Sequence, residues 1–348
     1  PEFIPRSIVG LDLGIKDIII TSFNEKIENS LASLEVKKRI KGLQKGLSRC
    51  KPSSKNRYKI KLKIQRAYIG VLSTPAYLIG ILGVSECLKR VKSKYPFYVV
   101  ITDQISLEIE KLLNEHGIYT IRRNSIQIPE IIKVKNSRGE FSHWTNTFDK
   151  LSIFELTQFD KIVYLDADLY IRKNIDELFQ YHHMATTPNR KYGPNITPPP
   201  ELISGLLVIE PEKGLLNKFS NILMSISDKR QSIGDQDILQ EYYINWANMP
   251  ELHLDLKYNA FFTYLDYYIN HCNYSLEDIS VFHFILTKKP WNFSVDTVDD
   301  YIKYLNNRID ILYDRYHTQD LLDCKNSGNK NRTIIAKEYL KLLDSCKL

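Results

Sequence analysis

The sequence has few cysteines and none of the spacings that build common metal or redox sites. Its five cysteines are scattered through 348 residues and form no C-x-x-C pair. This pattern argues against a disulfide framework and a zinc finger, and the odd number is typical of reduced thiols. No signal peptide opens the chain. We therefore expect a cytoplasmic protein, with a peripheral position at a membrane surface as the alternative.

The sequence also lacks a convincing membrane span. The single candidate, Ala67–Ser85, carries no charge, but Ser73, Thr74 and Pro75 interrupt its middle. Each half has the pattern of one element, a strand and then a helix, rather than of one continuous apolar helix. We find no internal repeat, and we expect no transmembrane segment.

Acidic residues are missing from one part of the chain. Between Val36 and Arg66 there are thirteen Lys or Arg residues and no Asp or Glu. Residues 1–66 hold 16 basic and 6 acidic side chains, whereas residues 67–348 hold 32 and 35. The formal net charge of +7 therefore belongs to the N-terminal segment. Consequently, the overall charge does not indicate that the body of the protein binds nucleic acid.

Apolar patterning predicts alternating strands and helices from residue 67 onward. We predict strands over 67–72, 97–102, 118–121, 161–165 and 202–209, and helices over 76–91, 107–116, 148–156, 213–225, 235–243 and beyond 296. This alternation implies a mostly parallel central sheet flanked by helices, an α/β fold. Before residue 67, two short strands within 7–22 and a basic helix over 36–47 are predicted.

An acidic triplet, Asp166-Ala167-Asp168, follows the apolar stretch 161–165. Side chains alternate along a strand, so the two aspartates point to the same side. The carboxyl end of a central strand is where open α/β sheets bind ligands. Two carboxylates at this place suit a hard divalent cation that also holds a diphosphate, although a solvated acid pair is the plainer interpretation.

Four motifs support the metal interpretation. They read LTQFDKIVYLDADLYIRKNIDELF (156–179), SGLLVIEP (204–211), GDQDIL (234–239) and HFILTKKPW (283–291). They occur in the order found in family 8 glycosyltransferases, the group of glycogenin and galactinol synthase, and the stretch from residue 67 to about 295 resembles this family. The resemblance implies a GT-A-type nucleotide-sugar-binding domain.

The resemblance also implies a role for each matching residue. Asp166, Asp168 and His283 match the family's manganese ligands, with Mg²⁺ as the alternative ion. Lys289 matches a lysine that holds the β-phosphate of the donor, where an ammonium group can offset charge on the departing UDP. Asp235 and Gln236 match residues near the transferred sugar and the reacting carbon.

The remaining donor contacts also come from the resemblance. The stretch AYIGVLSTPAYLIG (67–80) is similar to the family's uridine pocket, in which Tyr77 would stack on the base. The donor-binding residues implied are Leu72, Ser73, Thr74, Tyr77, Lys150, Asp166, Ala167, Asp168, Ser204, Gly205 and Lys289. The activity implied is retaining transfer of a hexose, glucose or galactose, from a UDP-sugar to a hydroxyl acceptor. That acceptor is a glycan, lipid, protein or polyol.

Two departures from the family pattern concern the acceptor. Ile203 stands where the family has an asparagine, so an amide that could bind sugar is replaced by an aliphatic side chain. Asp266 stands where glycogenin carries its self-glucosylated tyrosine, and Tyr264, Tyr267 and Tyr268 flank it. We therefore rank transfer to a separate acceptor above self-glycosylation. A donor-binding body that has lost turnover through Ile203 is a further hypothesis.

The N-terminal segment resembles a different family. Residues 8–66 are similar to the start of the nuclease core of OrfB-type insertion-sequence transposases, in which an aspartate at the position of Asp12 opens a metal site. Nuclease chemistry needs further carboxylates from distant strands, and none follows before residue 67. We thus expect three parts: a basic fragment (1–66) without nuclease activity, a catalytic domain (67–295) and a helical C-terminal extension (296–348).

The alternative function follows from the basic segment. Residues 36–66 would bind nucleic acid non-specifically with a strong salt dependence, while the transferase body would be inactive. A solvated helix explains the same charges. The oligomeric state is open, with a homodimer as one possibility.

Overall fold

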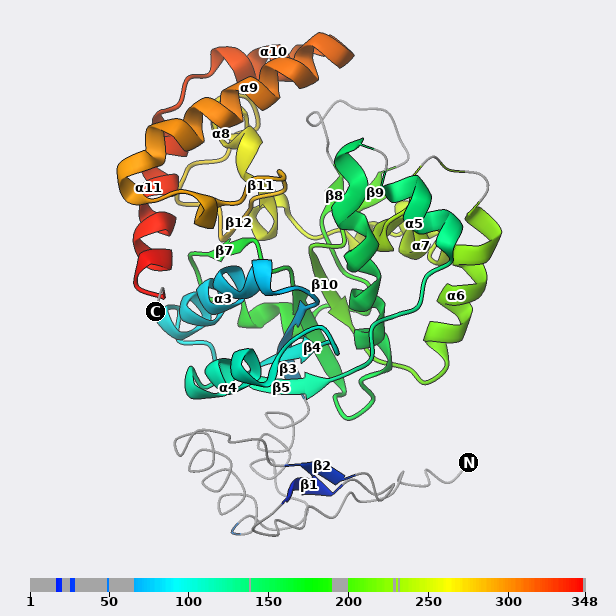
Figure 1. Cartoon of the computed structure of the whole chain (residues 1–348). Coiled ribbons are helices and arrows are strands. Elements are labelled where there is room, and N and C mark those ends of the chain that lie inside the picture. Colours follow the sequence, from blue (N-terminus) through cyan, green and yellow to red (C-terminus); the bar gives the residue numbers. More distant parts are fainter. Residues whose placement is uncertain are drawn as a thin grey trace.

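The computed structural model describes residues 17–20, 26–28, 49, 66–137, 139–189, 200–227, 230 and 232–346 (Figure 1). Near the N-terminus it describes a short antiparallel pair, β1 (Asp17–Ile20) and β2 (Lys26–Glu28). One strand thus lies within the predicted range 7–22, and its partner follows that range. The predicted helix over 36–47 lies outside the described residues. None of the described helices is both long enough and apolar enough to cross a membrane.

A five-stranded sheet forms the centre of the fold, in the order β10-β6-β3-β4-β5. Its strands are β3 (Arg66–Leu72), β4 (Phe97–Ile101), β5 (Tyr119–Arg122), β6 (Lys161–Leu165) and β10 (Leu206–Ile209). All neighbours are parallel except β10, which pairs antiparallel with β6 at one edge. The expected mostly parallel sheet is confirmed.

The strand predicted over 202–209 is divided in the structure. Residues 206–209 form β10, whereas β9 (Glu201–Leu202) pairs with β8 (Pro188–Asn189) in a separate antiparallel ladder. The three residues between β9 and β10 leave the strand conformation, and two of them, Ser204 and Gly205, belong to the candidate site described below.

Both faces of the sheet are buried, as the apolar strands predict. Tyr68 and Leu72 of β3 join one core cluster, together with α3 (Leu78–Arg90) and α4 (Leu107–Glu115). Ala67 and Ile69 point the other way and join a second cluster. That cluster includes residues of α5 (Glu130–Asn136), α6 (Leu215–Ile226), α7 (Asp235–Tyr242) and the 3-10 segment Gly139–Glu155.

The predicted helix over 148–156 is part of this 3-10 segment, which begins nine residues earlier. Runs of 3-10 helix longer than a few residues are uncommon, because the hydrogen bonds are poorly aligned. Shorter 3-10 turns occur at Pro75–Tyr77, Asp176–Gln180, Trp246–Asn248, Pro250–Leu252, Leu256–Tyr258, Phe262–Tyr264, Pro290–Asn292 and Val295–Thr297.

A second, three-stranded sheet follows the acidic triplet, in the order β11-β12-β7. It consists of β7 (Leu169–Ile171), β11 (Ala260–Phe261) and β12 (Val281–His283). β12 runs antiparallel to β7, with His283 opposite Leu169. This register places the end of β12 beside Asp168, although more than a hundred residues separate the two in sequence.

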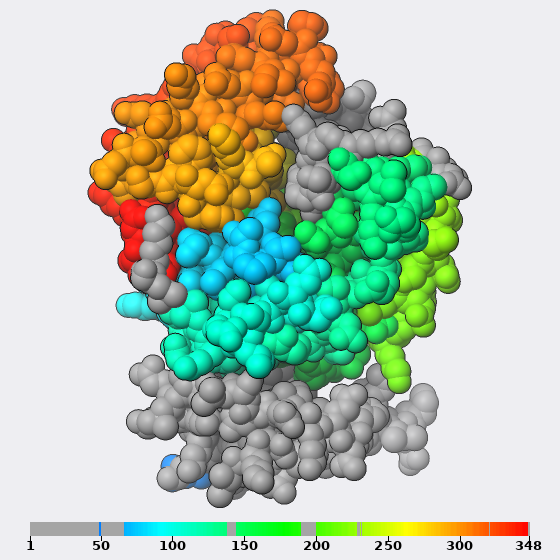
Figure 2. Space-filling view, viewed as in Figure 1, coloured from blue at the N-terminus to red at the C-terminus, as the bar shows by residue number. Residues whose placement is uncertain are grey.

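The C-terminal region is helical, as predicted. It contains α9 (Val298–Tyr316), α10 (Gln319–Asn326) and α11 (Lys330–Asp344), preceded by α8 (Leu265–His271). These helices share one core cluster with α3 and the central sheet. Of these helices, α11 packs on α3: Leu343 and Tyr339 lie beside Gly83. In the space-filling view the red residues of α11 lie next to the blue residues of α3 (Figure 2).

Candidate active site

A cavity of about 340 Å³ lies at the ends of β3 and β6. Its lining also includes the 3-10 segment 139–155, the start of α7 and the loop after β12. This cavity brings together most of the residues singled out from the sequence: Ser73, Thr74, Tyr77, Lys150, Asp166, Ala167, Asp168, Ser204, Asp235, Gln236, His283 and Lys289.

Asp166, Asp168 and His283 converge in this cavity. One ligand atom from each residue lies within 4.8 Å of the other two. Nε2 of His283 is 3.3 Å from Oδ1 of Asp168 and 3.9 Å from Oδ2 of Asp166. The two aspartates follow β6, and His283 arrives at the end of β12. Two carboxylates and an imidazole can therefore face one point.

The chemistry of these donors fits a divalent cation. Carboxylates suit hard cations, and an imidazole extends the range to first-row transition metals, so the set suits Mn²⁺. Nδ1 of His283 is buried and has no hydrogen-bond partner among the described residues. A hydrogen on Nδ1 would leave the lone pair of Nε2 directed toward the two carboxylates.

Gly205 makes room for His283. A Cβ atom on Gly205 would lie 2.4 Å from Cε1 and 2.9 Å from Nδ1 of His283, and 3.2 Å from Oδ2 of Asp166. The Gly205 carbonyl also accepts a hydrogen bond from the backbone N–H of Asp166, at 2.9 Å. Gly205 is absent from the cavity lining, so its role in the described structure is to let the ligands approach one another.

Lys289 is held beside the metal-binding group. Its Nζ donates to Oδ2 of Asp168 at 2.6 Å and to the carbonyl of Phe284 at 2.9 Å, and the side chain is buried. Burial alone would raise the pKa of the Asp168 carboxyl, but the nearby Lys289 ammonium lowers it by more, so that the net pKa is well below its usual value. Asp168 is therefore an anion.

Lys150 links the aspartates on two different elements. Its Nζ lies 3.1 Å from Oδ1 of Asp166 and 3.0 Å from Oδ2 of Asp235, and it donates to the carbonyl of Ser204 at 3.2 Å. Burial raises the pKa of Asp166, and the nearby Lys150 ammonium offsets only part of that rise. The sequence prediction put Lys150 near the donor. In the structure it also aligns the start of α7 with the acidic triplet.

Tyr164 is a site residue that the sequence prediction missed. Its hydroxyl donates a hydrogen bond to Oδ1 of Asp166, and its ring lies 5.0 Å from Nζ of Lys150. Tyr164 precedes Asp166 by two positions, so the two side chains share one side of the chain. The same alternation that pairs Asp166 with Asp168 is thus a signal that could have identified it.

Three residues of the predicted uridine pocket lie together in the wall of the cavity. Ser73, Thr74 and Tyr77 line the cavity, and the Tyr77 ring packs edge-on against Trp291 at 5.7 Å. The side chain of Leu72, in contrast, is fully buried in the core. The predicted approach of Leu72 to the donor stays a prediction, and of this strand's last two residues it is Val71 that lines the cavity.

Asp235 and Gln236 begin α7 at the cavity wall. Gln236 accepts a hydrogen bond from the backbone N–H of Ser204, at 3.2 Å. Ile203 is buried and is not among the described residues that line the cavity. Its backbone pairs with Thr186 and Thr187. The described geometry therefore does not support loss of turnover through Ile203.

The tyrosines considered for self-glycosylation are buried. Tyr264, Tyr267 and Tyr268 are at most 7% exposed, and none lines the cavity within the described chain. Asp266 lies between them and accepts a hydrogen bond from Nε of the buried Arg332 of α11, at 3.0 Å. Because α11 locks this segment in place, a separate acceptor is favoured.

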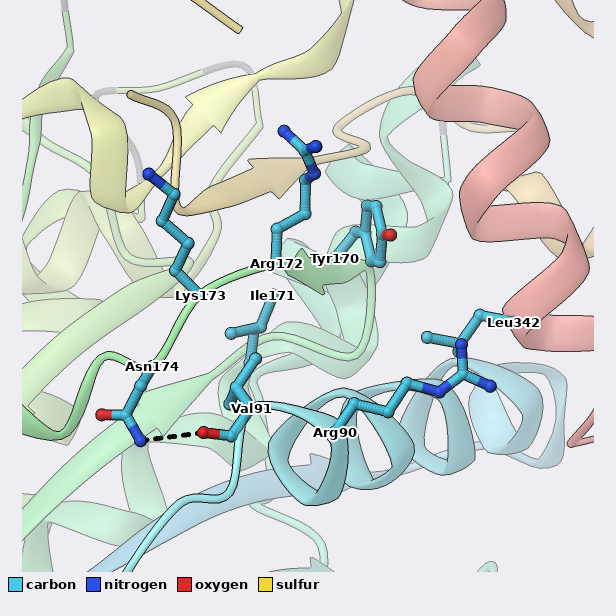
Figure 3. Close-up of a pocket in the computed structure, with 8 residues that line it drawn as sticks. All are labelled: Arg90, Val91, Tyr170, Ile171, Arg172, Lys173, Asn174 and Leu342. Carbon is cyan, nitrogen blue, oxygen red and sulfur yellow. Dashed lines mark hydrogen bonds between the residues drawn. The ribbon is translucent and has the colours of Figure 1, made fainter. Parts of the chain in front are cut away.

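A second cavity, of about 360 Å³, lies where the end of α3 meets β7 and α11 (Figure 3). Arg90, Arg172 and Lys173 line it, but they do not converge. Figure 3 shows Arg90 extending toward Leu342, whereas Arg172 and Lys173 extend away from α3. Each cation also has a partner: Glu86 for Arg90, Glu338 for Arg172 and the Glu277 carbonyl for Lys173. This arrangement does not form a second anion site.

Known proteins resemble the part of the chain that holds the first cavity. The model of Glycosyl transferase family 8 matches residues 69–294. The uncharacterized protein R707 of Acanthamoeba polyphaga mimivirus is 30% identical over 271 residues, which cover 69% of this chain and 91% of that protein. Glycogenin-1 of Caenorhabditis elegans is 27% identical over 238 residues, 66% of this chain and 51% of the relative.

Among solved structures, the glycosyltransferase GlyE of Streptococcus pneumoniae TIGR4 is similar, with a TM-score of 0.45 and 22% sequence identity. The match covers 65% of this chain and 56% of that chain.

Proposed function

Since the chain belongs to glycosyl transferase family 8, we propose that it is a retaining, metal-dependent hexosyltransferase. The donor is a UDP-sugar, with glucose or galactose as the hexose, and the acceptor is a hydroxyl group on a separate molecule. We also propose that the catalytic domain spans residues 67–295, with boundaries at 66/67 and 295/296.

One observation carries this proposal: the convergence of Asp166, Asp168 and His283 beside the buried Lys289. Two aspartates at the end of a strand, with no other functional group near them, would be solvated and would need no bound cation. Here the carboxylates are enclosed with an imidazole and two ammonium groups in one cavity. Such a mixture of charges suits a cation that binds a diphosphate. The Lys289 ammonium donates to Asp168 and to the Phe284 carbonyl, and its third hydrogen can serve a phosphate oxygen.

The metal ion would be Mn²⁺, held by Asp166, Asp168 and His283. When bound, it would offset the negative charge that grows on the diphosphate as the sugar leaves. Lys289, which contacts Asp168, would offset the same negative charge on the diphosphate. Its ammonium can donate to a β-phosphate oxygen more strongly as that oxygen gains charge, so it favours the transition state over bound substrate.

Transfer exchanges one bond to the anomeric carbon for another. The bond between this carbon and the β-phosphate oxygen breaks, and its electron pair stays on UDP. The acceptor oxygen forms the new bond on the same face, and its proton passes to the leaving phosphate oxygen. Gln236 carries an amide, which is a poor nucleophile, and Asp235 is engaged by Lys150. These residues therefore favour same-face attack over a covalent enzyme intermediate.

The sugar would lie between the metal group and α7. Asp235, Gln236 and Ser204 line this part of the cavity and carry hydrogen-bonding groups for its hydroxyls. Tyr77, Ser73 and Thr74 would hold the uridine at the opposite wall.

The test is incubation of the whole protein with UDP-glucose or UDP-galactose, Mn²⁺ and a panel of acceptors. We expect UDP release that requires Mn²⁺, products with the anomeric configuration of the donor by NMR, and a loss of kcat of at least about 10²-fold in Asp168→Asn. UDP release that is independent of both Asp168 and metal would contradict the proposal, as would inverted products.

The alternative function, nucleic-acid binding by residues 36–66, rests on charge in a segment outside the described residues. It predicts binding that weakens steeply with salt and disappears when residues 1–66 are removed. No feature of the described cavity favours it.

A further inference from the structure

The cavity extends beyond the groups assigned to the donor. Trp144, Asn146 and Thr147, from the early part of the 3-10 segment 139–155, also line it. The resemblance assigns no role to these three residues. They precede Lys150 in the same segment, so the element that positions Lys150 also brings an indole ring to the cavity.

Trp144 is fixed against the start of α7. The Cβ position of Gly234 is 3.5 Å from Cε3 and 3.6 Å from Cδ2 of the Trp144 ring. The hydroxyl of Thr147 donates to the Trp144 carbonyl at 3.0 Å and accepts from the N–H of Asp235 at 3.3 Å. One part of the indole thus rests on the Gly234 backbone, while the half-exposed side chain also lines the cavity.

Successive contacts place Trp144 next to the reacting centre. Asp166 contacts Lys150 at 3.1 Å, and Lys150 contacts Asp235 at 3.0 Å. Asp235 directly follows Gly234, and the Trp144 indole packs against Gly234. At the opposite end of this series of contacts from Trp144, Lys289 contacts Asp168 at 2.6 Å. Tyr77 lies near these two residues. Trp144 is therefore close to the place of the sugar and separated from the place of the base.

We propose that Trp144 is the platform for the acceptor, and that the acceptor is a pyranoside. This inference rests on the proposed function. The flat apolar face of an indole matches the C–H face of a pyranose ring, while Asn146 and Thr147 offer hydrogen bonds to its hydroxyls. The acceptor hydroxyl would thereby be held toward the anomeric carbon, where it forms the new bond and yields its proton to the leaving phosphate.

Other acceptor classes fit this part of the cavity less well. A lipid tail would need a long apolar groove, whereas most of the residues that line the cavity are of charged or polar types. The chain's own tyrosines at 264, 267 and 268 are buried away from the cavity.

A fluorescence titration tests the proposal, because the chain has only three tryptophans. UDP and Mn²⁺ are first added to saturation, and methyl α-glucopyranoside, methyl β-galactopyranoside, maltose or lactose is then titrated. Sorbitol and N-acetyltyrosinamide serve as non-pyranoside probes. The variants are Trp144→Phe, Trp144→Ala and the matched control Thr145→Ala, which changes the neighbouring residue outside the cavity lining.

We expect a pyranoside to change the emission of the wild type and of T145A, and to leave the emission of W144F unchanged. In transfer assays W144A should raise the acceptor KM by about tenfold or more, with the donor KM within about twofold of wild type. A pyranoside response that persists in W144F, or a response to sorbitol or N-acetyltyrosinamide alone, overturns the proposal. So does the absence of any sugar response in a protein that binds UDP.

The first addition separates this inference from the proposed function. If UDP does not bind in the presence of Mn²⁺, the proposed function is wrong, and that result appears before any acceptor is present. If UDP binds and only the effect of Trp144 is absent, the proposed function stands and the assignment of the acceptor platform is wrong.

Discussion

His283 reaches Asp166 across the backbone of Gly205, and this contact leaves no space for a side chain. The ring atom Cε1 lies 2.4 Å from the position that a Cβ would occupy, which is far inside van der Waals contact. The neighbouring atoms belong to a buried ring and to a carboxylate that Lys150 holds, so neither can move freely. Glycine is required here by close approach rather than by an unusual backbone angle.

Gly205→Ala should therefore displace His283 from the two aspartates. We expect the dissociation constant for Mn²⁺, measured by calorimetry, to rise by about 10- to 100-fold, as is common when the support of a metal ligand is lost. The melting temperature shows whether the protein is still folded. Unchanged Mn²⁺ affinity in a folded G205A protein would mean that His283 is not a ligand.

His183 provides a pH-dependent contribution to stability away from the site. Its Nδ1 accepts from the backbone N–H of Glu210 at 3.0 Å, so Nε2 carries the hydrogen in its contact with the Tyr243 hydroxyl at 2.8 Å. Burial lowers the pKa of His183 below its ordinary value of 6.5. In the unfolded chain His183 therefore takes up a proton at a higher pH than in the folded protein.

Folding stability should thus fall as the pH drops from about 6.5 toward the lower pKa of folded His183, and this contribution is fully present above 6.5. We expect urea unfolding between pH 7.5 and 5.5 to show a steeper loss for wild type than for His183→Asn. The difference is at most about 1.4 kcal/mol for every tenfold difference in proton affinity between the folded and unfolded chains. Equal slopes in the two proteins would exclude His183 as the cause.

At the scale of elements, α11 supports β7, which directly follows Asp168, and the end of β12, which carries His283. The buried ring of Tyr339 stacks on Tyr170 at 4.7 Å and on Phe284 at 5.0 Å. Phe284 directly follows His283, and its backbone N–H donates to the Asp168 carbonyl at 3.0 Å. α11 lies outside the residues matched by the family model, so this support is not implied by the family.

Tyr339→Ala should cost about 3–5 kcal/mol of stability and also weaken Mn²⁺ binding. Tyr339→Phe should have the stability and the Mn²⁺ affinity of the wild type. It keeps the ring stacking and loses only a 3.5 Å contact from the hydroxyl to the Leu169 carbonyl. Leu343→Ala is the matched control. Leu343 is also buried on α11, but it contacts α3 near Gly83. If L343A weakens Mn²⁺ binding as much as Y339A does, the positioning role of Tyr339 is wrong.

For the whole molecule, the two terminal parts should behave in opposite ways. The buried side chains of α9 to α11 belong to the same core cluster as α3 and β3. Removing them would expose a large apolar surface. The described residues that line the cavity, in contrast, all lie between Val71 and Lys289, after the basic segment.

We therefore expect a chain ending at residue 294 to be insoluble or unfolded, as judged by circular dichroism and gel filtration. A chain beginning at residue 66 should keep its melting temperature, and its rate of UDP release should stay within about twofold of that of the whole protein. A folded, active protein without residues 295–348 would show that the family-matched part suffices, and loss of activity on removing residues 1–65 would give the basic segment a role in catalysis.

Features that arise from local patterns could be predicted from the amino-acid order alone. Alternating and helical apolar spacing depends only on nearby residues, so the central strands, their flanking helices and the C-terminal stripe follow from it. The place of Asp166 and Asp168 follows in the same way, because they end a buried strand. The order of the four motifs identified the family, and most of the predicted site residues do line one cavity.

Which distant groups meet could be learned only from the folded chain, because packing between elements has no signature in a local window. The pairing of β7 with β12 sets the approach of His283 to Asp168, and the fit above Gly205 permits it. Strand alternation, combined with the position of the cavity, makes Val71 a wall residue. The contact between Trp144 and Gly234 likewise depends on how the 3-10 segment packs on α7, so no spacing in the sequence could reveal it.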